Sequence, residues 1–468
     1  MVNEFRTLLT AVAPLIISAG VMIVGNSLLG TMLTVRMDMA DVPIDRIGLV
    51  MALFSVGFVA GTLVCERLVS AVGHIRSFAA FAAIASASVL MHALYSNDFL
   101  WMGLRMVTGF SIACLLTIIE SWLNAKSPNA LRGRVMGIYM TVFYLAAGGS
   151  QLILLGFDPA GFELFAVVAM IISLSLVPLA LTRSQNPPEI VSDRLSLRAL
   201  VAISPLGVMG CFVAGIVISA FNALAPVYAR SITDTTDFVA VMMTAAIIGG
   251  FLFQLPIGRL SDHFDRRTVI LWLSIAVTLI AFAIGLGREF PTWLILTLVF
   301  AFGGIAYTLY PISLTYANDY LQPSQLVPAA AGLLLCYGIG AILGPIAGAA
   351  AVRPFGISGL FFAIALAGAI MVVFTLWRMR RRVAPALEDQ SHYVAIAPTS
   401  VASELDPRYE PEEGIQLEFD FDSVAGVDAL DAPPSGDADP KGDTGPDRPA
   451  ALAVARGNPA PGATKEAA

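Results

Sequence analysis

The stretch "PIGRLSDHFDRR", Pro256–Arg267, decides the fold, because it crowds five charged residues and a histidine into twelve positions between two long apolar runs. The whole chain of 468 residues is 57% hydrophobic and only 13% charged. Such a composition leaves too little polar surface to cover a water-soluble globule. We therefore interpret the stretch as a polar loop that joins two membrane-spanning segments.

Outward from this loop, twelve apolar runs are long enough to cross a bilayer, which takes about 20 residues in a helix. Unpaired backbone groups are costly in lipid, so each run must be a helix or a barrel strand, and unbroken apolarity of this length indicates helices. The first run is too long and too near the start to be a cleaved signal peptide. The runs lie at about 8–34, 46–69, 76–95, 99–123, 133–156, 161–181, 202–229, 238–258, 268–287, 292–317, 326–351 and 355–377.

Two unlike parts make up the formal net charge of −7. Residues 383–468 carry 17 acidic and 5 basic residues, whereas residues 1–382 carry 17 acidic and 22 basic residues. The first of these parts is rich in Pro, Ala and Gly and poor in aromatics, which predicts a disordered acidic tail. One segment of the tail, "IQLEFDFDSV" at residues 415–424, has an alternative to disorder. Its apolar and acidic residues alternate, which suits a short strand that docks on an unknown cytoplasmic protein.

The basic residues predict how the chain is oriented in the membrane. With the amino terminus inside, 16 of the Lys and Arg residues outside the spans face the cytoplasm and 5 face the opposite side. Cytoplasmic loops of membrane proteins carry the excess of basic residues. We therefore expect a multi-pass protein of the cell inner membrane with both termini in the cytoplasm.

An internal repeat organises the spans into six and six, on either side of the polar linker "TRSQNPPEIVSDRLSLR", Thr182–Arg198. Similar features recur at offsets of 192 to 196 residues, which indicates a duplication. The recurring pairs are Asn26 and Asn222, Arg67 and Arg259, Asn124 and Asn318, and Gly149 and Gly344. The predicted organisation is an amino-terminal half at 1–181, a cytoplasmic linker at 182–200, a carboxy-terminal half at 201–382 and the tail at 383–468. Two such halves around a cavity are typical of a rocking transporter.

The opening stretch resembles the signature loop of the major facilitator superfamily, G-x-x-x-D-R-x-G-R-R, at Gly258, Asp262, Arg266 and Arg267. Asp265 stands where the family has its second glycine, and Asp visits left-handed backbone conformations more readily than most residues. The glycine is expected to let neighbouring helices approach, and the carboxylates to exchange partners as the halves rock. The alternative is a solvated basic loop. The gating candidates are Gly258, Arg259, Asp262, Asp265, Arg266, Arg267, Gly73 and Arg76.

The first-half copy of this loop, "ERLVSAVGHIRS", is degraded. Gly73 and Arg76 remain, but Ser70 replaces the usual Asp and Glu66 replaces the first glycine. Glu66 is a candidate for the missing carboxylate, and the alternative is a helix-end acid that reaches out to water.

Further motifs carry the same resemblance. "LRMVTGFSIA" matches the family's R-x-x-x-G pattern at Arg105 and Gly109, and "GIGAILGPIAG", residues 338–348, resembles its antiporter motif. That motif usually lies in the fifth span, where this chain has "AAGGSQ", so antiport is not established. Residues 5–380 are similar to the YcaD-like branch of bacterial members in "IIESWLNAKSPNALRGRVMGIYM", "QLPIGRLSD" and "YTLYPISLTYANDYLQPSQLV". The helix-packing candidates are Gly340, Gly344, Pro345 and Gly348.

Charges inside spans are costly and therefore suggest function. Arg105 is a candidate for attracting an anionic substrate or tuning a proton-carrying acid, with pairing to helix carbonyls as the alternative. Glu120 is the protonatable candidate, with an ion pair to Arg132 or Arg134 as the alternative. Asp319 and His92 are expected to be interfacial. The remaining candidates, either cavity-lining or packing only, are Asn26, Asn222, Gln151, Gln254, Tyr307 and Tyr310.

We expect an all-α membrane protein with twelve transmembrane helices in two pseudo-symmetric six-helix halves, the major facilitator fold, with a disordered C-terminal tail. The expected function is secondary transport of a small amphipathic solute that is neutral or singly charged. The protein is expected to work as a monomer by alternating access. The proton gradient is the candidate energy source, with Glu120 or Glu66 as the group that carries the proton. The rivals are a membrane sensor that signals through the tail and an integral membrane enzyme. No cofactor, metal or nucleic acid is expected, since the four cysteines lack paired spacing and no nucleotide-binding loop occurs.

Overall fold

The computed structural model describes residues 2–181, 196–322, 325–381 and 393. The predicted tail, its candidate docking strand at 415–424 and most of the linker lie outside these residues, with Tyr393 as the exception. All described residues belong to one unit, 1–410. In this described part every regular element is helical, so the all-α membrane fold is confirmed.

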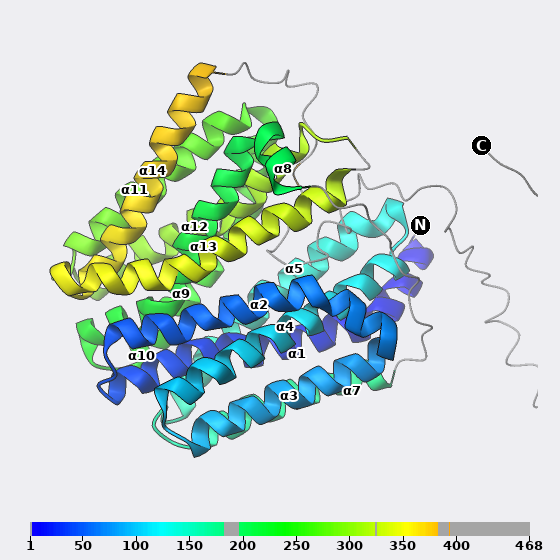
Figure 1. Ribbon diagram of the computed structural model, residues 1–468, viewed down its shortest axis with the longest axis horizontal. Coiled ribbons are helices and arrows are strands. Elements are labelled where there is room, and N and C mark those ends of the chain that lie inside the picture. The colour runs from blue at the N-terminus through cyan, green and yellow to red at the C-terminus, as the bar shows by residue number, and fades with distance from the viewer. Residues whose placement is uncertain (1, 182–195, 323–324, 382–392, 394–468) are drawn as a thin grey trace, which may run out of the picture. The chain divides into compact units, whose positions relative to one another are not determined.

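The first half of the chain forms seven α-helices and a short 3₁₀ turn. They are α1 (Val2–Met39), α2 (Ile44–Val72), α3 (His74–Leu94), α4 (Asp98–Lys126), α5 (Asn129–Gln151), η1 (Leu152–Gly156), α6 (Glu163–Leu174) and α7 (Leu176–Ala180). The second half forms α8 (Leu197–Ile203), α9 (Pro205–Thr233), α10 (Thr236–His263), α11 (Arg266–Leu286), α12 (Thr292–Asn318), α13 (Leu326–Phe355), η3 (Gly356–Ser358) and α14 (Gly359–Arg381). Figure 1 shows α13 lying along α2, so the halves meet side by side.

Eleven helical stretches of the described chain are long and apolar enough to span a membrane. The last of them, Leu326–Arg381, holds two helices, because η3 separates α13 from α14. At this corner Gly356 has φ +62°, a left-handed conformation that glycine adopts without steric cost. The predicted twelve spans thus match the structure.

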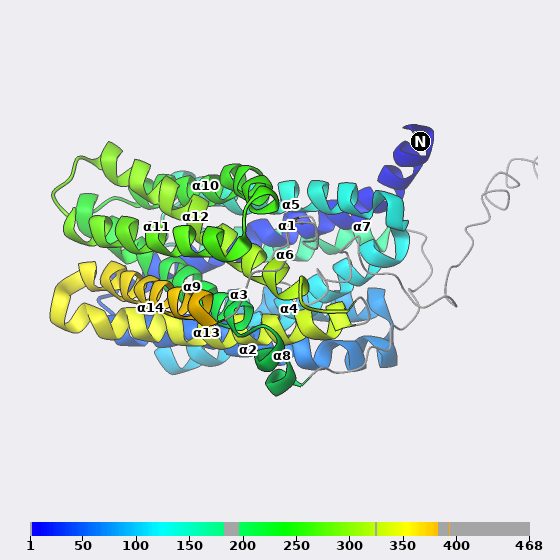
Figure 2. The same cartoon turned by 90° about the horizontal axis from the view of Figure 1, so that it is seen from above.

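Short connections reverse the chain between successive spans. Gly73 alone separates α2 from α3, and at the start of α4 the side chain of Asn97 accepts hydrogen bonds from the Phe99 and Leu100 amides. Because the chain reverses at each connection, successive spans run antiparallel, and Figure 2 shows these helices from above. We call the side where α1 begins and α14 ends the terminal side, and the other the opposite side.

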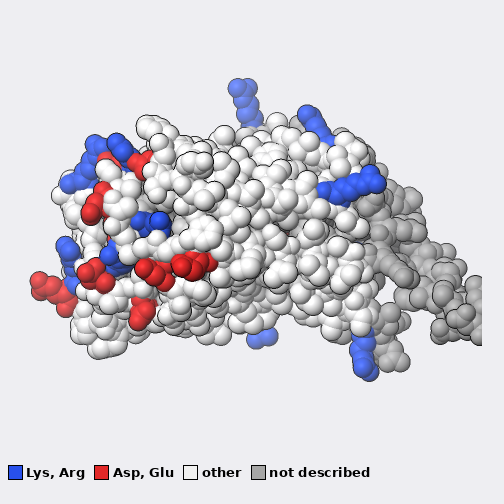
Figure 3. Space-filling view, turned by 90° about the horizontal axis from the view of Figure 1, so that it is seen from below, with Lys and Arg blue, Asp and Glu red and all other residues white. Residues whose placement is uncertain are grey.

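The outer surface suits a lipid environment. Large apolar side chains are exposed along the spans, among them Leu255, Trp272 and Leu279. On the face seen in Figure 3, the acidic side chains gather at one end and a largely uncharged surface lies beside them. Exposed apolar area of this extent is normal only where lipid covers it.

Glycine contacts repeat between the two halves. A Cβ at Gly57 or Gly109 would lie 1.9 or 2.1 Å from a backbone oxygen, so α2 and α4 touch backbone to backbone. In the second half, a Cβ at Gly249 or Gly303 would lie 2.1 or 2.0 Å from a backbone oxygen, so α10 and α12 touch in the same way. The oxygens that face these four glycines belong, in the order given, to Met106, Phe54, Phe300 and Ala246. The glycine pairs are displaced by 192 and 194 residues, which agrees with the offsets of the sequence repeat.

A substitution at this contact is expected to destabilise the protein. Gly109→Ala places a methyl group against the Phe54 oxygen, and forcing two packed helices apart costs about 1–3 kcal/mol. The apparent melting temperature of purified protein should fall by several degrees. Gly103→Ala on the same helix is the control, because its Cβ meets nothing within 4 Å. Equal melting temperatures for the two variants would contradict the contact.

Candidate transport pathway

Aromatic side chains from both halves meet where α5, α9, α10 and α12 converge. The Tyr144 ring of α5 packs edge-on against Tyr307 of α12 with centroids 6.2 Å apart, and lies 6.1 Å from the Phe251 ring of α10. The Tyr307 hydroxyl donates a 2.9 Å hydrogen bond to Oδ1 of Asn222 on α9. Tyr307 and Asn222, expected separately, are thus brought together, and Tyr144 joins them from the other half.

Tyr310 lies one helical turn beyond Tyr307 and faces a further span. Its buried ring packs edge-on against Tyr337 of α13 at 5.1 Å. Tyr337 also lies within electrostatic range of Tyr307. Three α12 and α13 tyrosines therefore extend the cluster that begins at Tyr144.

Glu120 is fully buried on α4, and its Oε1 accepts a 2.8 Å hydrogen bond from the Tyr139 hydroxyl of α5. Arg132, the candidate ion-pair partner, is buried as well. Tyr310 lies within electrostatic range of this carboxyl group. A protonatable group is thus buried within electrostatic range of the tyrosine cluster, and its own partner, the Tyr139 phenol, can stabilise it in either protonation state.

The four candidate amides differ in their hydrogen-bond partners. Gln151 donates a 2.9 Å hydrogen bond to Ser27 and so joins α5 to α1, as Asn222 joins α9 to α12. Oδ1 of Asn26 and Oε1 of Gln151 are buried without a hydrogen-bond partner among the described residues, whereas the Gln254 side chain faces the Tyr144 and Tyr393 hydroxyls. Buried polar atoms are seldom left unpartnered, so the Asn26 and Gln151 oxygens are available to a ligand or to water.

Arg105 is 3% exposed, and its guanidinium lies 4.4 Å from the centre of the Phe54 ring. Its Nε and Nη1 atoms have no hydrogen-bond partner within the described part of the chain, so the expected alternative of carbonyl pairing fails for these two atoms. The neighbouring His92 is also buried, with Nδ1 2.7 Å from the Ser88 oxygen. The His92 ring lies in the last turn of α3, where it packs against Trp101 inside the half.

In the second-half loop the charges pair within that half. Arg266 is 1% exposed and pairs with Asp319 at the end of α12 and with Asp262, the latter at 3.3 Å. Asp319 ends α12 as expected, but its side chain is 1% exposed because it pairs with Arg266. Asp265 does not use a left-handed conformation, since its φ is −54°; instead it caps α11 by accepting a hydrogen bond from the Arg267 amide.

Gly258 also differs from expectation. Its missing side chain makes room for the ring of Tyr393 rather than for a neighbouring helix: a Cβ would lie 2.2 Å from Cδ1 of that ring. Arg259 is exposed.

The first-half copy of the loop forms no ion pair within the described part of the chain. Glu66 and Arg76 are exposed, and neither forms an ion pair among the residues that the structure describes. Gly73 has φ 93° and closes α2 with a hydrogen bond from its amide to the Val69 oxygen. This arrangement favours the interpretation of Glu66 as a helix-end acid in contact with water.

The packing motif of α13 joins it to three helices, α9, α14 and α2. A Cβ at Gly340 would lie 2.0 Å from the Phe212 oxygen of α9, and one at Gly344 would lie 2.4 Å from the Ile216 oxygen. Gly348 faces α9 and α14 through Leu224 and Leu360. The Pro345 oxygen, in turn, would lie 2.7 Å from a Cβ at Gly48 of α2, in the other half.

On the opposite side, contacts join the halves directly. Arg230 of α9 pairs with Asp38 of α1 at 2.6 Å, and Arg353 of α13 pairs with Asp45 of α2 at 2.6 Å. The Thr244 hydroxyl of α10 donates to the Gly148 oxygen of α5 at 3.1 Å. The halves are therefore closed together on this side.

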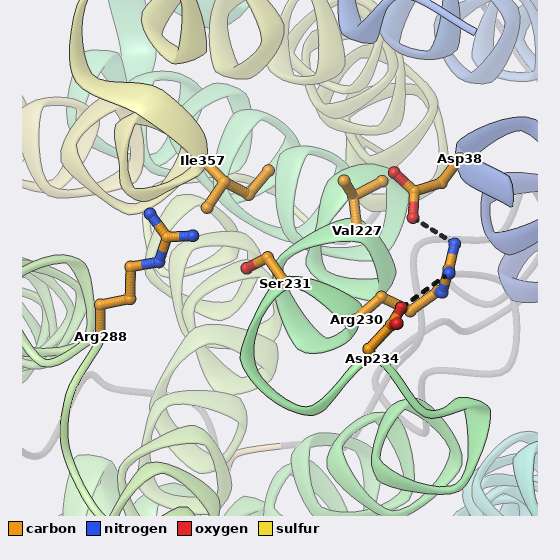
Figure 4. A pocket seen from close by; sticks show the side chains of 7 residues that line it. All are labelled: Asp38, Val227, Arg230, Ser231, Asp234, Arg288 and Ile357. Atoms are coloured by element: carbon orange, nitrogen blue, oxygen red, sulfur yellow. Dashed lines mark hydrogen bonds and ion pairs between the residues drawn. The ribbon is translucent and has the colours of Figure 1, made fainter. Parts of the chain in front are cut away.

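Figure 4 shows the Arg230 pair, with the guanidinium between Asp38 and Asp234 at the rim of a cavity of about 290 Å³. Arg288 faces the same cavity from its far wall. The spacing of four between Arg230 and Asp234 indicates an ion pair from the sequence alone, whereas the partner of Arg230 on α1 is brought to it only by the fold.

A family model described as "Major Facilitator Superfamily" matches residues 15–236 and 207–403. The chain belongs to the Major Facilitator Superfamily. It is 26% identical over 352 residues to the "Uncharacterized MFS-type transporter YcaD" of Salmonella newport (strain SL254), covering 75% of this chain and 91% of that protein. The resemblance to the YcaD-like branch is thus confirmed, and the chain is a multi-pass membrane transporter for a small-molecule solute.

Solved structures share the fold at low sequence identity. The nucleoside transporter NupG superimposes with a TM-score of 0.66 at 15% identity, covering 79% of this chain and 98% of that one. A D-xylose–proton symporter superimposes with a TM-score of 0.64 at 12% identity, covering 81% and 99%. At these identities the likeness establishes the facilitator fold alone.

Proposed function

We propose that this facilitator-superfamily member is a secondary transporter of a small amphipathic solute, which binds among Tyr144, Tyr307 and Tyr310. The observation that carries the proposal is the meeting of Tyr144 with the Tyr307–Asn222 pair, because it places phenol and amide groups from both halves at one point. Aromatic faces bind planar apolar groups, while hydroxyl and amide groups orient polar ones. The solute is neutral or singly charged.

The proposed mechanism is a rocking of residues 1–181 against residues 201–382. The Arg230–Asp38 pair and the Thr244–Gly148 hydrogen bond join the halves on the opposite side, from which we infer a state that opens toward the terminal side. We assign the terminal side to the cytoplasm, because it carries the excess of basic residues. Opening to the other side requires the Arg230–Asp38 contact to break and the terminal ends to close.

Proton coupling is proposed to use Glu120 rather than Glu66. Glu120 is buried within electrostatic range of Tyr310, whereas Glu66 is exposed in this structure. A buried carboxyl group is the type that can switch between charged and neutral forms as its surroundings change.

A thermal-shift screen of the purified full-length protein against ring-containing metabolites and drugs tests the binding site. We expect Tyr144→Ala and Tyr307→Ala to weaken binding of any stabilising compound by about tenfold or more, the usual effect of removing a central aromatic anchor. Tyr307→Phe should weaken it by about fivefold, since one hydrogen bond contributes about 1 kcal/mol. Tyr95→Ala, at an exposed tyrosine, is the matched control. Unchanged affinity in both alanine variants would refute the site.

A further inference from the structure

Tyr393 is the only described residue beyond α14, and it packs against the hydrophobic core. Its ring lies on Gly258, where a Cβ would come within 2.3 Å of both Cδ1 and Cε1. Its backbone amide donates a 2.8 Å hydrogen bond to Oδ1 of Asp262. Ring and backbone are thus both held by the last turns of α10, at the terminal side.

The environment of the ring includes the other half of the protein. Tyr393 lies within electrostatic range of Tyr144 of α5, and beside the side chain of Gln254 on α10. Burial raises the pKa of the Tyr393 phenol, so it stays neutral at physiological pH. The residue therefore sits where α5 and α10 approach each other across the two halves.

The polar atoms of this pocket link the ring to the aromatic cluster. The Tyr393 hydroxyl and the Gln254 side chain are both buried, and the Gln254 amide faces the hydroxyls of both Tyr393 and Tyr144. Tyr393 therefore shares its polar partner with a residue of the proposed transport pathway.

The pocket is also specific to the second half. Gly258 provides its floor, and the equivalent position of the first-half loop is Glu66, whose side chain would fill the same space. Asp262, which holds the Tyr393 amide, is also a partner of Arg266 in the gating loop. Occupation of the pocket therefore involves a carboxylate that belongs to the gating loop itself.

We propose that Tyr393 is an intramolecular plug, which occupies an aromatic-accepting pocket between α5 and α10 and blocks the terminal side of the transport pathway. The plug must leave before the terminal ends of the two halves close, because its ring stands between them. Its presence slows the cycle and favours the state that is closed on the opposite side. This inference rests on the transport pathway proposed above.

The test measures access to the pocket and needs no substrate. Gln254→Cys is introduced into the full-length protein, whose four native cysteines are buried, and labelled with a hydrophilic maleimide. Adding Tyr393→Ala is expected to speed labelling by about tenfold or more, since it removes the group that covers the site. Tyr393→Phe should leave the rate unchanged, because the ring remains. His263→Cys, exposed in the same loop, is the control and should label equally fast in each background.

Gly258→Ala provides an independent route to the same result. Its methyl group would collide with the Tyr393 ring, so it should eject the plug and speed labelling of Gln254→Cys with Tyr393 still present. Combining it with Tyr393→Ala should add nothing further. Slow labelling in both the Tyr393→Ala and the Gly258→Ala backgrounds would overturn the plug. Because no transport is measured, this failure is distinct from a failure of the proposed function.

Discussion

Replacement of Glu120 by Gln is expected to abolish accumulation of solute driven by a proton gradient, while exchange of solute across the membrane continues. The carboxyl group is fully buried and accepts a hydrogen bond from Tyr139, so exchange of a proton with water requires the conformational cycle to change its surroundings. Glutamine has the same shape and keeps an oxygen that accepts from Tyr139, but it cannot carry a proton. The loss should be on the order of tenfold or more, typical of removing a positioned proton-transfer group.

Proteoliposomes containing the purified protein provide the measurement, with the stabilising compound from the thermal-shift screen as the transported solute. Uptake under an imposed pH gradient is compared with counterflow in its absence. Glu66→Gln is the matched control, because the same chemical change is made at an exposed acid on α2. If Glu120→Gln still accumulates solute under the gradient, Glu120 is not the coupling residue.

The fold was predictable because its determinants are local. Each span needs only an unbroken apolar run, and each loop only a cluster of polar residues, so periodicity and length locate both. The repeat added the division into halves, and the glycines at Gly57 and Gly249 show that equivalent positions make equivalent contacts. The break between the last two predicted spans, 326–351 and 355–377, lies close to the corner at Gly356 that separates α13 from α14.

The candidate site was predictable only in part, because its contacts join residues far apart in the chain. Tyr307 and Asn222 were each identifiable as polar groups inside apolar runs, but 85 positions separate them and their hydrogen bond was not foreseeable. Tyr144 and Tyr139 were missed. Both carry a hydroxyl into an apolar span, and this signal, already used for Tyr307, would have found them.

Ionic partners were the least predictable feature. Asp319 follows the last turn of a span, where an acid normally reaches water, and only the fold brings it to the buried Arg266 guanidinium. Arg230 and Asp38 are likewise separated by 192 positions and belong to different halves. A sequence shows the position of each charged residue along its span, but its ion-pair partner depends on how the helices of the two halves pack together.

Asp38→Asn is therefore expected to shift the protein toward the state that opens on the opposite side. The substitution removes the contact between α1 and α9 but leaves Arg230 its bond to Asp234, so it tests the link between halves without leaving a bare guanidinium. The pair is largely shielded from solvent, with 17% and 26% of the two side chains exposed, and its loss should cost about 1–2 kcal/mol. That free energy corresponds to roughly a five- to thirtyfold change in population.

Access to Thr34→Cys measures this shift, because Thr34 is fully buried on α1 and its hydroxyl bonds the Ala223 oxygen of α9. A membrane-impermeant maleimide added from the opposite side should label the cysteine faster in the Asp38→Asn background. Asp45→Asn is the matched control, because its partner Arg353 is 72% exposed and water and salt already screen that pair. If Asp38→Asn labels no faster than Asp45→Asn, the Arg230–Asp38 contact does not hold the halves together, and closure must come from packing such as that of Gly48 against Pro345.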